Sequence, residues 1–95
     1  MIVGVLRLEI LLHAPHSLKE KRGLVKKLLA RCRNDFPLSC AEVDAQDLWQ
    51  RTSLGFAMVH HDEGAIHRVY ERLAESIEET GFAEIVDRFI EFLHY

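Results

Sequence analysis

Four histidines lie in two close pairs, His13 with His16 and His60 with His61. Imidazole nitrogens together with carboxylates bind zinc, nickel or manganese, and Asp62 directly follows the second pair. A divalent metal would support hydrolytic chemistry if the fold brought the two pairs together. The sequence therefore raises a metal-site hypothesis, and the alternative is scattered, solvent-exposed histidines at loop ends.

Basic side chains are concentrated in residues 19–33, which hold seven of the twelve Lys and Arg residues. At 100° per residue, Lys19, Arg22, Lys26 and Arg33 fall within about 60° of one another on a helix. Cations along one ridge can follow the phosphates of an RNA backbone and release its counterions. These four residues are the predicted RNA- or phosphate-binding ridge.

The charges of the chain are distributed unevenly. Up to Val59 there are nine basic and six acidic residues, and after it three basic and nine acidic ones. The alternative to RNA binding is therefore a solvated helix face, balanced by an acidic second helix beside it or in a neighbouring subunit.

A second candidate binding segment contains Asp47, Trp49, Gln50 and Arg51. It places one large aromatic residue and a cation where a short turn would suffice, and Trp with Arg is a typical interface anchor pair. We predict that these residues bind a partner. The alternative is that Trp49 closes one end of the core while Asp47 and Arg51 pair locally.

Residues 54–59, Leu-Gly-Phe-Ala-Met-Val, overlap the strand pattern of RNA-recognition domains. The basic first position and the second stacking aromatic are missing, and residues 2–12 supply no partner aromatic. A base-stacking platform is therefore incomplete. We assign Phe56 and Met58 to an oligomer or partner contact instead.

Hydrophobic periodicity and capping residues divide the chain into six elements. Ser17 with Glu20 is a capping-box signature, Asp62 caps a second helix and Gly81 ends it. Strands are predicted at 2–12, 38–45, 51–60 and 83–93, and helices at 18–34 and 63–80. The buried stripe predicted for the first helix is Leu18, Val25, Leu28, Leu29 and Cys32.

The order of these elements is β, α, β, β, α, β, the signature of the split βαβ, ferredoxin-like fold. We predict one α+β domain over residues 1–95, with a four-stranded antiparallel sheet and both helices on one face. Within it, strands 2–12 and 51–60 are expected side by side and parallel in the middle. That direction would bring the two histidine pairs to the same edge.

The other face of this sheet has no element to cover it. Strand 51–60 is apolar on both sides, and strands of that kind are normally buried on both. A second copy of the chain is the expected cover, so we predict a homo-oligomer.

Composition bounds the class of protein. The chain has 95 residues, 48% of them hydrophobic, which suits a single core. No signal peptide or membrane span is predicted, because Arg7 and Glu9 interrupt the apolar start. The spacing of Cys32 and Cys40 matches no metal or redox motif. We expect reduced packing cysteines and a cytoplasmic location, with no membrane partner.

Three stretches resemble the YlxP-like family of small bacterial proteins. They are the opening Met-Ile-Val-Gly-Val-Leu-Arg-Leu-Glu, the run Ser-Leu-Lys-Glu-Lys-Arg at 17–22, and Ala-Glu-Val-Asp-Ala-Gln-Asp-Leu-Trp-Gln-Arg at 41–51, followed by Leu-Gly at 54–55. The resemblance covers the whole chain and is strongest in the first sixty residues. The residues that match the family pattern are Ser17, Lys19, Glu20, Lys21, Arg22, Asp44, Gln46, Asp47, Trp49, Gln50 and Arg51.

The resemblance implies a ferredoxin-like fold but no settled biochemical activity. Members are often encoded beside translation-initiation and ribosome-maturation factors, which implies ribosomal RNA or a ribosomal subunit as a partner. The four histidines are outside the family pattern, and Gly23 departs from the bulkier residue expected there.

Three functional hypotheses follow. The first is a non-enzymatic RNA- or ribosome-associated module that uses the basic ridge. The second is a homo-oligomeric protein-interaction module that uses the sheet face and Trp49. The third is a metal-dependent enzyme at the histidine edge. We assign no catalytic residue, cofactor or small-molecule ligand, and favour a non-enzymatic role.

Overall fold

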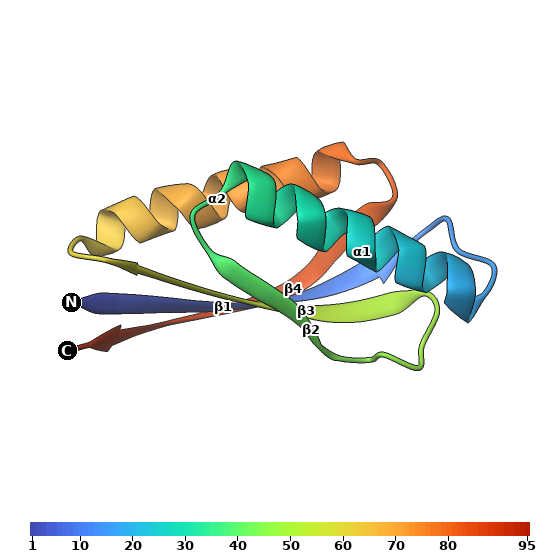
Figure 1. The fold of residues 1–95 in the computed structure, drawn as a ribbon, viewed down its shortest axis with the longest axis horizontal. Coiled ribbons are helices and arrows are strands. Elements are labelled where there is room, and N and C mark those ends of the chain that lie inside the picture. The colour runs from blue at the N-terminus through green and yellow to red at the C-terminus, as the bar shows by residue number, and fades with distance from the viewer.

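A computed structural model describes all residues, 1–95 (Figure 1). Its elements are β1 (Ile2–Leu12), α1 (Leu18–Asp35), β2 (Ser39–Asp44), β3 (Arg51–His60), α2 (Glu63–Glu79) and β4 (Ala83–His94). The predicted order is confirmed, and every boundary lies within one or two residues of its expected place. Neither helix is long and apolar enough to span a membrane.

The four strands form one antiparallel sheet in the order β2-β3-β1-β4. The ferredoxin-like fold is therefore confirmed, but the predicted parallel pairing of β1 with β3 is wrong. Ile2 pairs with His60, and Leu11 pairs with Arg51. The crossover through α1 makes β1 and β2 run in the same direction, and the tight β2–β3 connection reverses β3, so β3 runs against both neighbours.

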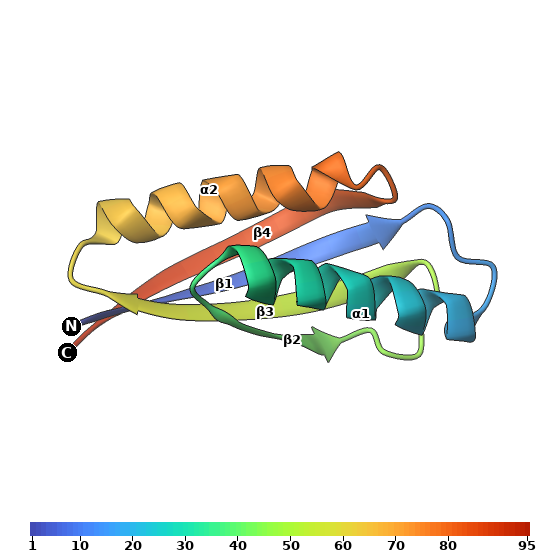
Figure 2. The ribbon, with the colours of Figure 1, turned by 45° about the horizontal axis from the view of Figure 1, so that its top comes forward.

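Both helices cover the same face of the sheet, as predicted (Figures 1 and 2). In Figure 2, α2 lies along the β4 side and α1 along the β2 side. No helix covers the opposite face, which is called the open face below.

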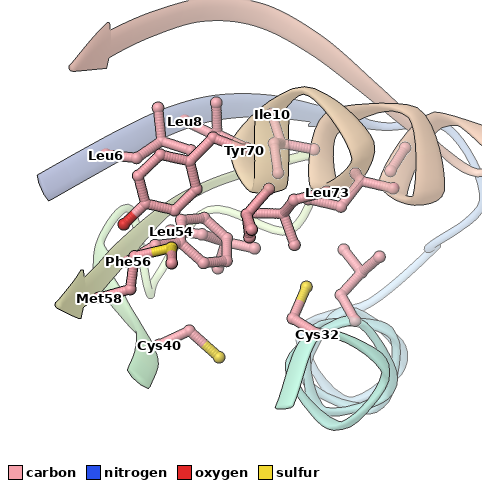
Figure 3. Close-up of a cluster of buried hydrophobic side chains, with 14 of the residues drawn as sticks. Leu6, Leu8, Ile10, Cys32, Cys40, Leu54, Phe56, Met58, Tyr70 and Leu73 are labelled. Atoms are coloured by element: carbon pink, nitrogen blue, oxygen red, sulfur yellow. The ribbon is translucent and has the colours of Figure 1, made fainter. Parts of the chain in front are cut away.

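The core lies between the sheet and the helices (Figure 3). Alternate residues of β1 point into it, and Leu8 and Ile10 are fully buried. From α1, Val25, Leu28 and Cys32 are buried as predicted, whereas Leu18 and Leu29 are only half-buried. Lys21 is one of the seven cations of this helix, and its side chain is unexpectedly fully buried.

Helix α2 packs closely on the sheet at Gly4 of β1. A Cβ added there would overlap the Ile66 side chain of α2, so a glycine is required. The Tyr70 hydroxyl donates a 2.6 Å hydrogen bond to the Gly4 carbonyl oxygen. Burial raises the pKa of Tyr70 to about 12.

The predicted helix starts are confirmed in atomic detail. Ser17 Oγ accepts the Glu20 N–H at 3.2 Å, while the Glu20 carboxylate accepts the N–H of His16 instead of that of Ser17. At α2, Asp62 Oδ1 accepts the Gly64 N–H at 3.1 Å. Gly81, just after α2, has φ 82°, the left-handed conformation that favours glycine.

Candidate nucleic-acid interface

The predicted ridge is a solvent-exposed flank of α1. Lys19, Arg22, Lys26 and Arg33 are all exposed. Arg33 Nη2 donates a 2.8 Å hydrogen bond to the Cys40 carbonyl oxygen of β2. Because the four residues share one side of the helix, this contact orients the whole ridge toward the β2 edge of the sheet, away from α2.

The opposite flank of α1 makes the contacts with the acidic helix. Arg31 Nε donates to Ser76 Oγ at 2.8 Å, and Arg31 Nη2 lies 3.6 Å from Glu79 Oε2. Lys19, Arg22 and Lys26 form no ion pair with any carboxylate of the chain. The acidic residues of α2 therefore do not neutralise the ridge within one copy of the chain.

Gly23 lies beside the ridge and is exposed. No atom would lie within 4 Å of an added Cβ at this position. Packing within the chain therefore does not account for the departure from the family pattern.

Lys21 has a structural role that the sequence reasoning missed. Its Nζ lies 2.7 Å from Glu42 Oε2 and donates hydrogen bonds to the carbonyl oxygens of Ala45 (2.7 Å) and Gln46 (3.1 Å). An ammonium group has three protons, so all three are satisfied. Thr52 Oγ1 also donates to Glu42 Oε2, at 2.6 Å.

This buried network joins the first turns of α1 to the β2–β3 loop, residues 45–50. Ala45 has φ 62°, a conformation that costs a non-glycine residue on the order of 1 kcal/mol. The two hydrogen bonds from Lys21 help to hold the loop in that conformation. The motifs at 17–22 and 41–51 of the family resemblance thus meet in space. One signal was available, because Lys21 lies between Val25 and Leu28 on a helical projection, inside the buried stripe.

The β2–β3 loop presents Trp49 to solvent. Its side chain is 43% exposed and lies outside the core, so the alternative in which Trp49 closes the core is wrong. Asp47 and Arg51 are both exposed and form no ion pair with each other. Gln50 contributes its carbonyl oxygen to the Leu12 N–H at 2.8 Å. Trp49 and Arg51 therefore remain available to a partner, close to the N-terminal turns of α1.

The prediction that Phe56 and Met58 contact a partner is wrong. They are 2% and 5% exposed and lie in the core beneath the helices (Figure 3). Both faces of β3 are apolar, so periodicity alone did not show which face the helices cover. The residues of β3 on the open face are Ser53, Gly55, Ala57 and Val59. Base stacking by Phe56 is excluded for the same reason.

The histidine pairs do not meet. Because β1 and β3 are antiparallel, His13 and His16 follow one end of β1, whereas His60 pairs with Ile2 at the other end. His13 Nε2 lies 2.9 Å from Glu84 Oε1, and the rings of His60 and His61 stack at 4.5 Å. No group of three or more potential ligands is arranged to hold a metal ion. The metal hypothesis depended on the parallel pairing and is withdrawn with it.

The two cysteines are free and buried. Burial raises the pKa of Cys32 to about 12 and also raises the pKa of Cys40. A thiol with a raised pKa is a poor nucleophile, so both side chains are suited to packing and neither to catalysis.

Fold and surface together define a small ferredoxin-like α+β protein with one unpaired basic helix flank and one open sheet face. Residues 3–89 match the family DUF503, described as proteins of unknown function. The chain belongs to this family.

The similarity to one individual protein supports the family resemblance of the sequence motifs. The chain is 36% identical over 84 residues to the uncharacterized protein YlxP of Bacillus subtilis (strain 168), covering 88% of this chain and 89% of that protein. The expected membership of a YlxP-like family of uncharacterised proteins is confirmed.

Two solved structures have the same fold. One is a structural-genomics structure of protein YJCS, with a TM-score of 0.64, 9% identity, and coverage of 97% of this chain and 99% of that one. The other is a mutant form of SnoaB, a cofactor-independent oxygenase from Streptomyces nogalater, with a TM-score of 0.52, 9% identity, and coverage of 99% and 92%. At this identity the likeness extends to the fold alone.

Proposed function

We propose that this protein is a non-enzymatic RNA-binding module that holds a phosphate backbone along the outer flank of α1, with ribosomal RNA or a ribosomal subunit as its partner. The observation that carries the proposal is the exposed ridge of Lys19, Arg22 and Lys26, none of which is paired with a carboxylate. Unpaired cations in a row gain most from phosphate contacts, because each contact releases a condensed counterion.

The β2–β3 loop supports the same proposal. Lys21 holds this loop against the N-terminal turns of α1, so exposed Trp49 lies at the end of the molecule that carries Lys19 and Arg22. A base stacked on an aromatic side chain contributes about 1–3 kcal/mol and requires no particular sequence. Cations for phosphates beside one aromatic ring suit single-stranded RNA better than a duplex.

An enzymatic function of the kind named for the oxygenase with this fold has less support. The pocket between α2 and β4 has a volume of about 80 Å³ and includes Tyr70 and His67 in its lining. Ligand pockets usually have about 300–1,000 Å³. The Tyr70 hydroxyl is also engaged with Gly4. The larger hollows, of about 310 to 460 Å³, are open depressions of the surface, which favours a role for the surface.

The test is a titration of the protein into purified small ribosomal subunits and into a short single-stranded RNA of mixed sequence, at several salt concentrations. Four phosphate contacts predict a log–log salt slope of about −3 for a single strand. In the variant Lys19→Gln, Arg22→Gln, Lys26→Gln the slope should fall toward about −0.7, the value for one remaining contact. Circular dichroism should show unchanged folding.

A matched control carries Lys27→Gln, Arg68→Gln and Arg72→Gln, exposed cations that lie off the ridge. It loses the same charge, so its slope should stay close to the unmodified value. Equal slopes in the two variants would overturn the ridge assignment, because only net charge would then matter. Absence of binding at low salt would overturn RNA binding altogether.

Trp49 provides a second readout, because it is the only tryptophan in the chain. RNA should quench its fluorescence if a base stacks on it. Trp49→Ala should weaken binding by about 1–3 kcal/mol and leave the salt slope unchanged. Full affinity in this variant would restrict the interface to the ridge.

A further inference from the structure

The open face of the sheet is more apolar than a solvated surface requires. It carries Val3 and Val5 of β1, Ala57 and Val59 of β3, and Phe89 of β4. Val59 is 56% exposed and Phe89 58% exposed. Contiguous apolar surface of this kind marks an interaction site.

Side-chain size differs between the two halves of this face. Strand pairing aligns the residues in rows across the order β4, β1, β3, β2. One row is Phe89, Arg7, Gly55, Ala41, and the next is Glu91, Val5, Ala57, Ser39. In these two rows the β4 and β1 positions carry the bulkier side chains and the β3 and β2 positions the small ones. Val59 of β3 and Val43 of β2, whose side chain lies against Gly55, are the bulky exceptions in the small half. A shallow hollow of about 270 Å³ lies over the small half, lined in part by Ala41, Gly55 and Ala57.

We propose that a second copy of this chain covers the open face, packed sheet on sheet about a twofold axis parallel to the strands. Such an axis places β4 of one copy over β2 of the other at the same height along the strands. Phe89 of each copy then lies over Ala41 in the hollow of its partner, and Val5 lies over Ala57. An axis perpendicular to the strands would instead place Phe89 over β4 of the partner. Bulky side chains would then face bulky side chains.

The size of the face matches what a stable dimer needs. Four strands of 6 to 12 residues, at roughly 3.3 Å per residue and spaced roughly 4.8 Å apart, span a plane of roughly 600 Å². Side chains make the accessible surface larger than the plane, which brings it near the roughly 800 Å² per partner of a standard interface. Aligned sheet-on-sheet packing accommodates the twist of both sheets.

Three charged residues of the open face, Arg7, Glu9 and Asp44, are paired within their own chain, whereas Asp87 and Glu91 form no ion pair. Arg7 Nε lies 2.7 Å from Glu9 Oε1, and Arg7 Nη2 lies 3.3 Å from Asp44 Oδ2. Ser53 donates its hydroxyl to the other Glu9 oxygen. These groups therefore enter an interface already hydrogen-bonded, which limits the cost of burying them. The ridge on α1 is on the helical side of the molecule, so the dimer proposal is independent of RNA binding.

The test is sedimentation equilibrium over a wide range of protein concentration. The unmodified protein should have twice the 11.0 kDa mass of the chain. Phe89→Glu should give a monomer, because it places a charge in an apolar hollow. The control Ala30→Glu adds the same charge at an exposed position of α1, on the helical side of the molecule, and should remain dimeric. If Phe89→Glu fails to fold by circular dichroism, Val5→Glu serves in its place.

A charge-pair rescue tests the axis. Phe89→Arg and Ala41→Asp should each weaken the dimer, and the double variant should restore it. Within one chain these positions are three strands apart, roughly 14 Å, so they can pair only across the interface. A monomer at every concentration, or a dimer unaffected by Phe89→Glu, would overturn the proposal. A double variant without rescue would overturn the assigned axis.

Discussion

The two faces of the sheet are built by the same four strands but differ sharply in their surroundings. Leu8, Ile10 and Leu54 on the helical face are fully buried, whereas Val59 and Phe89 on the open face are more than half exposed. Both faces carry large apolar side chains. Hydrophobicity alone therefore does not determine which face forms the core. The position of the helices determines it.

The helical face was determined by connectivity. A right-handed crossover from β1 to β2 sends α1 to one side, and the second crossover sends α2 to the same side. On β1 this agrees with residue type, because Arg7 and Glu9 occupy the open face. On β3 both faces are apolar, so residue type does not show which face the helices cover. The prediction that Phe56 contacts a partner was wrong for this reason.

The largest difference between the two faces should appear when one phenylalanine on each is truncated. Phe56→Ala should lower the free energy of unfolding by about 3–5 kcal/mol, since it opens a cavity in the core. Phe89→Ala should change the unfolding of the monomer by no more than about 0.5 kcal/mol, because its side chain is exposed. Urea unfolding at a concentration where the protein is monomeric measures both. Equal costs would contradict the assignment of the faces.

A smaller effect is expected at the buried ion pair beneath α1. Lys21→Ala should cost about 3 kcal/mol, the lower end of the range for breaking a buried pair, because the Glu42 side chain keeps 17% of its exposure. The β2–β3 loop loses its two hydrogen bonds, so the fluorescence of Trp49 should also change. Lys19→Ala is the matched control and should cost less than about 0.5 kcal/mol. A cost no larger than that of Lys19→Ala would contradict the structural role.

The smallest expected change in stability is at Tyr70, whose buried hydroxyl lies on the helical face and has a raised pKa. Tyr70→Phe loses the hydrogen bond to Gly4 and should lower the free energy of unfolding by about 1 kcal/mol near pH 7. Burial raises the pKa of Tyr70 from 10.0 to about 12, so the folded state keeps a proton that the unfolded state releases. The stability that Tyr70 contributes is complete below pH 10 and is lost as pH rises toward about 12.

The difference between the unmodified protein and Tyr70→Phe should therefore narrow over that interval. Denaturant unfolding at a series of pH values measures it. A constant difference from about pH 9 to about pH 12 would mean that the Tyr70 hydroxyl is not buried.

Parts of the candidate site were predictable because they depend on local geometry. A helical repeat sets Lys19, Arg22, Lys26 and Arg33 on one flank regardless of what surrounds the helix. The same repeat sets Lys21 inside the buried stripe, but its hydrogen-bond partners were not predictable, because they are carbonyl groups of a loop more than twenty residues later. The histidine site failed for a related reason, since the meeting of His13 with His60 depends on strand direction.

Local patterns were enough to establish the element order, the helix caps at Ser17 and Asp62, the basic flank of α1 and the family. Each of these follows from residue type and from spacing within one element, which act over a few residues. The antiparallel pairing of β1 with β3, the hydrogen-bond partners of Lys21, the burial of Phe56 and the exposure of Phe89 became known only from the folded chain. Those outcomes depend on which distant segments pack together, and no local pattern contains that information.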